Sequence, residues 1–258
     1  KINIQKAAGR LQVLENMTRG GETMPGCVGI GHTRWATHGK PTDINAHPHD
    51  NQDGTIAVVH NGIIENYQEL KDKLIRKGYS FYSATDTEVA VKLVDYYYKK
   101  YLGTPVDAIN HAMVRIRGSY AMAIMFKDYP EEIYVTRKDS PMILGVENGE
   151  SYIASDVPAI LKYTRNVYYI GNLEMARVRK GEITFYNLDG DEIQKEPKTI
   201  EWDAEADKLV QAERYARDQT RKGYRAGHYE RSFSTQAGDV TLKVPKLKGL
   251  TFESAIIQ

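Results

Sequence analysis

Residues 56–64 read IAVVHNGII, an apolar run that leads into an Asn-Gly pair and then a second, shorter apolar run. The continuous apolar pattern of residues 56–60 is typical of a strand buried on both faces. Asn61-Gly62 is a common turn sequence, and a helical pattern begins at Ile63. This stretch predicts a core strand that turns directly into a helix.

Helix and strand patterns continue on both sides of this stretch. Apolar residues recur at helical spacing in three segments, and strand-like runs flank turn residues in two others. The predicted elements are helices over 67–77, 86–101 and 104–117, hairpins over 119–137 and 176–187, and a short strand over 28–30. Helices separated from paired antiparallel strands indicate an α+β layered domain.

Composition indicates an ordinary globular protein, with 41% apolar residues, 27% charged residues and a net charge of +1 among 258 residues. The sequence has neither a long apolar run nor a signal-peptide pattern, so we expect a cytoplasmic protein without a membrane partner. Its single cysteine, Cys27, excludes an internal disulfide. Because Cys27 begins the predicted strand, we expect a buried, inert thiol.

The character of the chain changes near Ala206. Residues 204–258 carry ten Lys and Arg against seven Asp and Glu, and tyrosines are interleaved with the basic residues of 214–231. A short strand pattern follows at 240–244. We therefore expect one domain over residues 1–203 and a small basic C-terminal segment over 207–258.

Three short segments carry residues suited to binding and catalysis. Arg34, with Thr37 and His38 close behind it, could hold a carboxylate through bidentate and neighbouring hydrogen bonds. Asn61 and Gly62 could form an oxyanion hole. Taken singly, a surface arginine and an ordinary turn are the better explanations of these residues.

The third segment surrounds Asp86. Thr85 and Glu88 fit a capping box, and Asp86 would lie in the first turn of the helix, where a carboxylate is favoured. Such a carboxylate could also hold a substrate ammonium group. The alternative of a metal site at His47 and His49 is disfavoured because three ligands with suitable spacing are lacking. We expect neither a metal nor a cofactor.

Together, the three segments resemble the class II glutamine amidotransferases, in particular the glutaminase domain of the glucosamine-6-phosphate synthases. The resemblance covers nearly four fifths of the chain. It rests on residues 29–39, 45–49, 58–67, 83–89, 117–121, 140–141, 154–156 and 200–203. It implies an αββα sandwich of the N-terminal-nucleophile hydrolase type.

The resemblance also implies roles for the site residues. Arg34, Thr37 and His38 would bind the α-carboxylate of L-glutamine, Asp86 its α-amine, and Trp35 would help to position the site. Asn61 and Gly62 would stabilise the oxyanion. The ammonia would serve glutamine–fructose-6-phosphate aminotransferase (isomerizing) activity, for which a sugar-isomerase domain binds fructose 6-phosphate.

In that family the nucleophile is an N-terminal cysteine whose α-amine acts as the base. This chain opens with Lys1, and the family's first strand has no counterpart in it. We therefore expect an incomplete sandwich that is catalytically incompetent as written, with Cys27 unable to replace the missing nucleophile.

The tail resembles a different family, the N-terminal region of Mutator-type transposases, through residues 211–215, 225–231 and 238–246. This resemblance leaves open an alternative function as a DNA-binding fragment. With an excess of only three basic residues, we expect any DNA contact to be weak and sensitive to salt.

Overall fold

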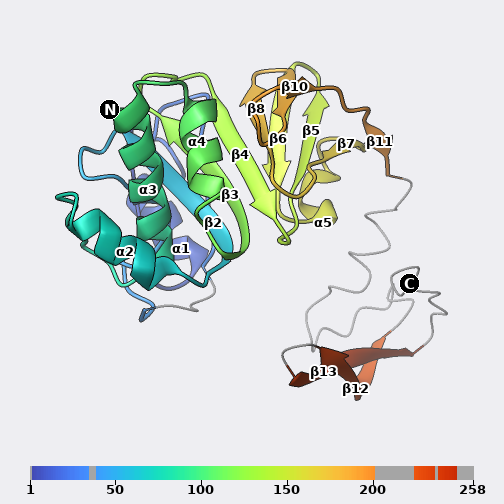
Figure 1. The fold of residues 1–258 in the computed structure, drawn as a ribbon. Helices are drawn as coiled ribbons and strands as arrows, with labels where there is room; N and C mark the ends of the chain where they lie inside the picture. The colour runs from blue at the N-terminus through green and yellow to red at the C-terminus, as the bar shows by residue number, and fades with distance from the viewer. Residues whose placement is uncertain (1, 35–38, 201–223, 236–237, 249–258) are drawn as a thin grey trace. The chain divides into compact units, whose positions relative to one another are not determined.

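The computed structural model describes residues 2–34, 39–200, 224–235 and 238–248, the last two ranges by their backbone alone. The chain divides into two compact units, Lys1–Ile200 and Glu201–Gln258. The second unit contains an antiparallel hairpin of β12 (Tyr224–Thr235) and β13 (Gly238–Lys248) (Figure 1). The strand predicted at 240–244 is part of β13, whereas the predicted junction near Ala206 lies outside the described residues.

The first unit is built around two antiparallel sheets (Figure 1). The larger sheet has the strand order β1-β2-β3-β4-β8-β9-β10, and the smaller has the order β11-β7-β5-β6. The strands of the larger sheet are β1 (His49–Asp50), β2 (Ile56–Ile64), β3 (Gly118–Phe126), β4 (Ile133–Lys138), β8 (Glu174–Arg179), β9 (Glu182–Tyr186) and β10 (Glu192–Ile193). Those of the smaller are β5 (Ile143–Glu147), β6 (Glu150–Ala154), β7 (Asn166–Tyr169) and β11 (Lys198–Thr199).

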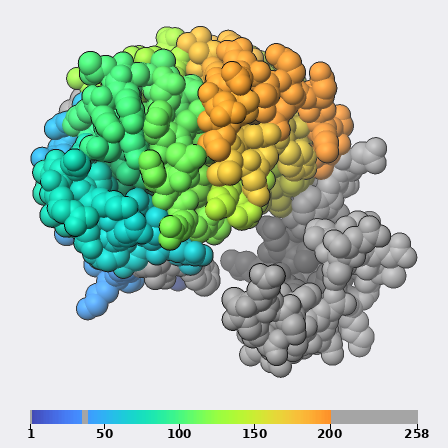
Figure 2. Space-filling model, in the orientation of Figure 1, coloured from blue at the N-terminus to red at the C-terminus, as the bar shows by residue number. Residues whose placement is uncertain are grey.

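Helices α2, α3 and α4 pack on one face of the larger sheet, over β2 and β3 (Figure 1). The helices of the unit are α1 (Leu11–Thr18), α2 (Tyr67–Ile75), α3 (Asp86–Tyr101), α4 (Pro105–Met113) and α5 (Val157–Ile160). At the start of α4, Thr104 and Asp107 form a reciprocal capping box. In the orientation of Figure 2, the teal and green surfaces of α2, α3 and α4 lie side by side on the face turned to the viewer.

Side-chain alternation along β3 explains the position of the larger sheet. Tyr120, Met122 and Ile124 join the cluster beneath the helices, whereas Ala121 and Ala123 join a second cluster on the opposite face. The second cluster includes Met142, Leu144 and Ile170 and therefore extends toward the smaller sheet. The larger sheet is thus buried on both faces, which confirms the predicted α+β layered class.

Several local predictions are confirmed. The hairpins predicted over 119–137 and 176–187 correspond to β3–β4 and β8–β9. Helices begin at Tyr67, Asp86 and Pro105, as their patterns indicate. No helix among residues 2–34 and 39–200 is long and apolar enough to cross a membrane.

Three local predictions are wrong. Asn61-Gly62 does not turn, because β2 continues to Ile64 in unbroken register with β3. Residues 28–30 do not form a strand, since they lack a hydrogen-bonded neighbour strand among the described residues, although Val28 and Ile30 still pack against the second cluster. Thr85 caps α3, but Glu88 binds elsewhere instead of completing a capping box.

Candidate active site

The end of β2 supplies two of the predicted site residues. Residues 56–60 are buried, whereas Asn61 and Gly62 are exposed where the strand emerges from the core. Gly62 has φ of +124°, and a Cβ atom there would meet the carbonyl oxygen of Ser119 on β3. Only glycine fits this backbone position, so the neighbouring strand lies directly against the main chain of Gly62.

Asn61 is fixed by a hydrogen bond to a histidine. Its Oδ1 lies 2.7 Å from Nε2 of His32. A side-chain amide has two N–H donors besides its oxygen, and neither donor has a partner among the described residues. Asn61 therefore keeps donors that could bind an oxygen atom in the pocket.

Asp86 is the first residue of α3, where the helix dipole favours a carboxylate. Its side chain is buried, and Oδ2 accepts a hydrogen bond of 2.9 Å from the backbone N–H of Ile64 on β2. The same oxygen lies 4.0 Å from Nδ1 of His60. The second carboxylate oxygen is therefore the one available to a cation.

Arg34 is the predicted site residue that carries a positive charge. The guanidinium is half-buried and donates to the backbone carbonyls of Gly39 and Lys40, in both cases at 3.4 Å. These two bonds help to hold the side chain in place.

A cavity of about 330 Å³ brings four predicted residues together. Arg34, Asn61, Gly62 and Asp86 all line it, and its other lining residues are His32, Thr33, His47, His60, Ile63, Thr87 and Ser119. The remaining predicted site residues, Trp35, Thr37 and His38, lie outside the described residues. The cavity therefore has a cation, an anion and amide donors on its walls.

The three histidines that line the cavity, His32, His47 and His60, were not predicted as site residues. The rings of His32 and His47 stack with their centroids 4.1 Å apart. His47 Nδ1 accepts a hydrogen bond from the backbone N–H of His60. The rings of His47 and His60 both contact the Thr87 hydroxyl. No sequence signal groups these residues, because they come from separate segments that meet only in the folded chain.

Burial disfavours protonation of two neighbouring histidines, His47 and His49. Desolvation, reinforced by the neighbouring His32 and His49 rings, lowers the pKa of His47 to about 2. Desolvation and the charge of Lys6 lower the pKa of His49 to about 3. Among residues 2–34 and 39–200, no group of three or more His, Cys, Asp or Glu side chains is arranged to hold a metal ion.

Cys27 differs from its predicted state. The thiol is exposed rather than buried, because the segment that carries it is not a strand in the sheet. It lines a separate cavity with Met125, Phe126 and Pro130, and it does not line the cavity of Arg34 and Asp86.

Comparison with known proteins finds two families along the chain. Residues 32–162 match the family described as a glutamine amidotransferase domain. Residues 193–258 match the Mutator family of transposases.

Two bacterial relatives and one archaeal relative are each called glutamine–fructose-6-phosphate aminotransferase (isomerizing). The chain is 52% identical to that of Caldanaerobacter subterraneus subsp. tengcongensis over 205 residues, 50% identical to that of Clostridium acetobutylicum over 206, and 46% identical to that of Pyrococcus horikoshii over 206. Each alignment covers 80% of this chain. The chain spans about a third of the length of these relatives (33%, 33% and 34%).

A solved structure also resembles the first unit. The glutamine phosphoribosylpyrophosphate amidotransferase of B. subtilis aligns with a TM-score of 0.50 and 26% sequence identity, covering 61% of this chain and 34% of that chain. The mixed α+β architecture is therefore shared with a second amidotransferase.

Proposed function

Because the chain belongs to the class II glutamine amidotransferases, we propose that the cavity at the end of β2 binds L-glutamine by its amino-acid head group. Arg34 binds the α-carboxylate, and Asp86 binds the α-ammonium group. Asn61 and Gly62 provide donors for the oxyanion that forms when the side-chain amide is attacked. Trp35, Thr37 and His38 complete the binding residues.

The observation that carries this proposal is the meeting of Arg34, Asn61, Gly62 and Asp86 on one cavity. A zwitterionic head group needs an anion and a cation placed apart, and a partly desolvated pocket strengthens both contacts. A developing oxyanion needs N–H donors that are already in place. The cavity offers both.

The relatives suggest a wider setting for glutamine binding. Their name pairs glutamine with fructose 6-phosphate, and this chain spans a third of their length. We therefore assign the chain the glutamine side of such a reaction, with a sugar-isomerase domain as its partner. For residues 1–203 we propose the αββα sandwich of the N-terminal-nucleophile hydrolases.

Hydrolysis needs a nucleophile in addition to this pocket. A cysteine thiolate is the reactive form for attack on an amide carbonyl. Cys27, the single cysteine of these 258 residues, lines another cavity. We therefore propose that a polypeptide of residues 1–258 binds glutamine but does not hydrolyse it.

Calorimetry with L-glutamine tests binding, and an ammonia assay tests hydrolysis. Asp86→Asn removes the charge that holds the ammonium group, so we expect a loss of affinity of at least about tenfold. Asp107→Asn is the matched control, because Asp107 lies in the first turn of α4, outside the cavity. Absence of binding by folded wild-type chain would contradict the proposal, and ammonia release that depends on Cys27 would contradict its inactive part.

The Mutator match supports a second candidate, a DNA-binding function of residues 207–258. Retention on DNA should weaken steeply between 50 and 200 mM salt, because binding through phosphates releases counterions. Deletion of residues 207–258 should abolish retention. Retention that survives the deletion would remove this candidate.

A further inference from the structure

Asn45 lies between the two segments that carry the opposite charges of the cavity. It is 7% exposed. Its Nδ2 donates to the carbonyl of Lys40 at 3.0 Å, and its Oδ1 accepts from the backbone N–H of Ala84 at 3.0 Å. One side-chain amide thus joins the segment after Arg34 to the segment before Asp86.

The first of these bonds leads directly to Arg34. The Lys40 carbonyl that receives the Asn45 donor also receives Nη1 of Arg34. A carbonyl oxygen has two lone pairs and can accept both bonds. The position of this carbonyl therefore affects the guanidinium.

The two segments are also in close contact at Asn45. A Cβ atom added to Gly39 would lie 2.9 Å from Nδ2 of Asn45 and 3.2 Å from Cβ of Ala84. Gly39 has φ of +76°. The backbone at this point therefore has no room to move toward Asn45 without displacing it.

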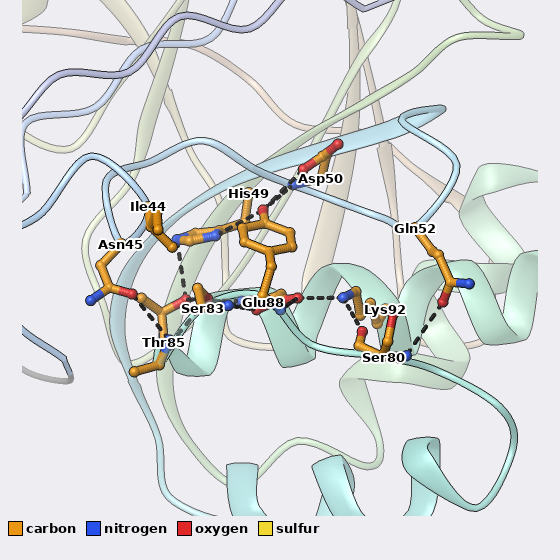
Figure 3. Close-up of polar contacts among 12 residues, drawn as sticks. Ile44, Asn45, His49, Asp50, Gln52, Ser80, Ser83, Thr85, Glu88 and Lys92 are labelled. Carbon is orange, nitrogen blue, oxygen red and sulfur yellow. Dashed lines mark hydrogen bonds and ion pairs between the residues drawn. The ribbon is translucent and has the colours of Figure 1, made fainter.

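The Asp86 side of the bridge is firmly held (Figure 3). Glu88 is fully buried and accepts hydrogen bonds from the backbone N–H groups of Tyr82 and Ser83. It also forms an ion pair with the buried Lys92, which donates to the Ser80 carbonyl. Residues 80–83 are therefore tied to the first turns of α3.

Thr85 extends this hold to the residue before Asp86. Its hydroxyl caps the N–H of Glu88 and contacts Nε2 of His49 at 3.1 Å. Because Ser83 and Thr85 are held on either side of Ala84, this segment cannot easily move to follow a shift of Asn45. The bond from Ala84 to Asn45 therefore fixes one end of the bridge relative to α3.

We propose that Asn45 is a positioning residue that fixes the separation between the Arg34 guanidinium and the Asp86 carboxylate. The pocket then selects ligands that carry an ammonium group and a carboxylate on the same carbon. This inference rests on the proposed function. Asn45 does not line the cavity itself, so its effect on the ligand is exerted through the two segments.

Three probes separate positioning from a general structural role. L-Glutamine engages both charges, 4-carbamoylbutanoate lacks the amine, and 4-aminobutanamide lacks the carboxylate. NMR titration measures the affinity of wild-type chain and of two variants for each probe. Asn45→Asp keeps the acceptor and removes the donor to Lys40, and Asn45→Ser is a neutral, shorter substitute that reaches neither partner.

We expect each Asn45 substitution to lower the affinity for L-glutamine about tenfold, an effect of the size found between groups that belong to one hydrogen-bond network. The affinity for each probe with one charge should fall less than about threefold, because binding one charge does not depend on the separation between Arg34 and Asp86. Equal weakening of all three probes would overturn the inference. Asn51→Ser is the matched control for Asn45→Ser, because Asn51 is a buried bridging amide that bonds Asp95 outside the cavity. It should leave unchanged the ratio between the affinity for L-glutamine and the affinities for the probes with one charge.

Hydrogen exchange in the ligand-free chain tests the bridge independently of glutamine. Both Asn45 variants should speed exchange of the Ala84 amide at least about tenfold, and Asn51→Ser should not. Unchanged exchange at Ala84 would overturn the inference whatever the ligand results. Faster exchange together with no glutamine binding by wild-type chain would instead contradict the proposed function, and the selectivity part of this inference with it.

Discussion

At the scale of single residues, Gly62 shows how the backbone limits the composition of the site. Its φ of +124° is a conformation that side chains rarely adopt, and the Ser119 carbonyl occupies the place of a Cβ atom. The first effect is a strain in the residue itself, whereas the second is a clash with β3. Any larger residue must therefore open the β2–β3 pair next to Asn61.

We predict that Gly62→Ala lowers the free energy of unfolding by more than about 1 kcal/mol, because both effects act together. Urea unfolding followed by circular dichroism measures the loss. Gly149→Ala is the matched control, since Gly149 also has a positive φ but nothing lies within 4 Å of its Cβ position. Equal losses in the two variants would show that the Ser119 clash contributes nothing.

Asp86 illustrates what sequence could predict about the site. Its place at a helix start follows from a local pattern, and the structure confirms the cap at Thr85. The contacts of His32, His47 and His60 could not be predicted, because the residues are separated along the chain and meet through tertiary packing. Sequence thus identified residues near helix and strand ends but missed the three histidines that line the same cavity.

At the scale of elements, hairpins and helix starts were predictable because their signals lie within a few residues. The strand at 28–30 was not, because an apolar pattern reports burial while a strand also requires a paired neighbour. Val28 and Ile30 do pack against the core and are partly buried, whereas Cys27 beside them is exposed. The predicted turn at Asn61-Gly62 was wrong because pairing with β3 overrides the local turn preference.

Helix α3 carries a buried ion pair whose contribution can be measured. Glu88 and Lys92 have side chains 0% and 2% exposed. We predict that Glu88→Gln or Lys92→Met alone costs about 3–5 kcal/mol of stability, because each leaves a charge buried without its partner. The double substitution should cost less than the sum of the two, as denaturant unfolding would show.

The control for this cycle is a second pair with the same spacing. Glu69 and Lys73 on α2 are joined at 2.5 Å, but their side chains are 51% and 58% exposed. Their coupling should be about 0.3–0.5 kcal/mol, the range for solvated helix pairs. If the buried pair couples no more strongly than the exposed one, burial does not strengthen it.

At the scale of the whole molecule, two buried histidines, His47 and His49, connect the site with the stability of the first unit. His47 and His49 occupy the same region as Asp86 and contact Thr87 and Thr85 respectively. Both rings are buried beside cationic or ring neighbours that oppose protonation. Acidification therefore acts on the fold and on the candidate site together.

We predict that the first unit loses stability as the pH falls below about 6.5, the pKa of an unfolded histidine. Burial lowers the pKa of His47 to about 2 and of His49 to about 3. Between these values and 6.5 the unfolded chain binds protons that the folded chain excludes, so stability is complete above pH 6.5 and declines below it. Each histidine should contribute a slope of about 1.4 kcal/mol per pH unit.

Urea unfolding at pH 7.5, 6 and 5 measures this slope. His47→Asn should reduce the slope by about one histidine's share, even if the variant is less stable at pH 7.5. His111→Asn is the control, because His111 is an exposed histidine at the end of α4. A slope that stays the same in His47→Asn would contradict the prediction. It would mean that His47 can bind a proton in the folded chain and is therefore not kept neutral near Asp86.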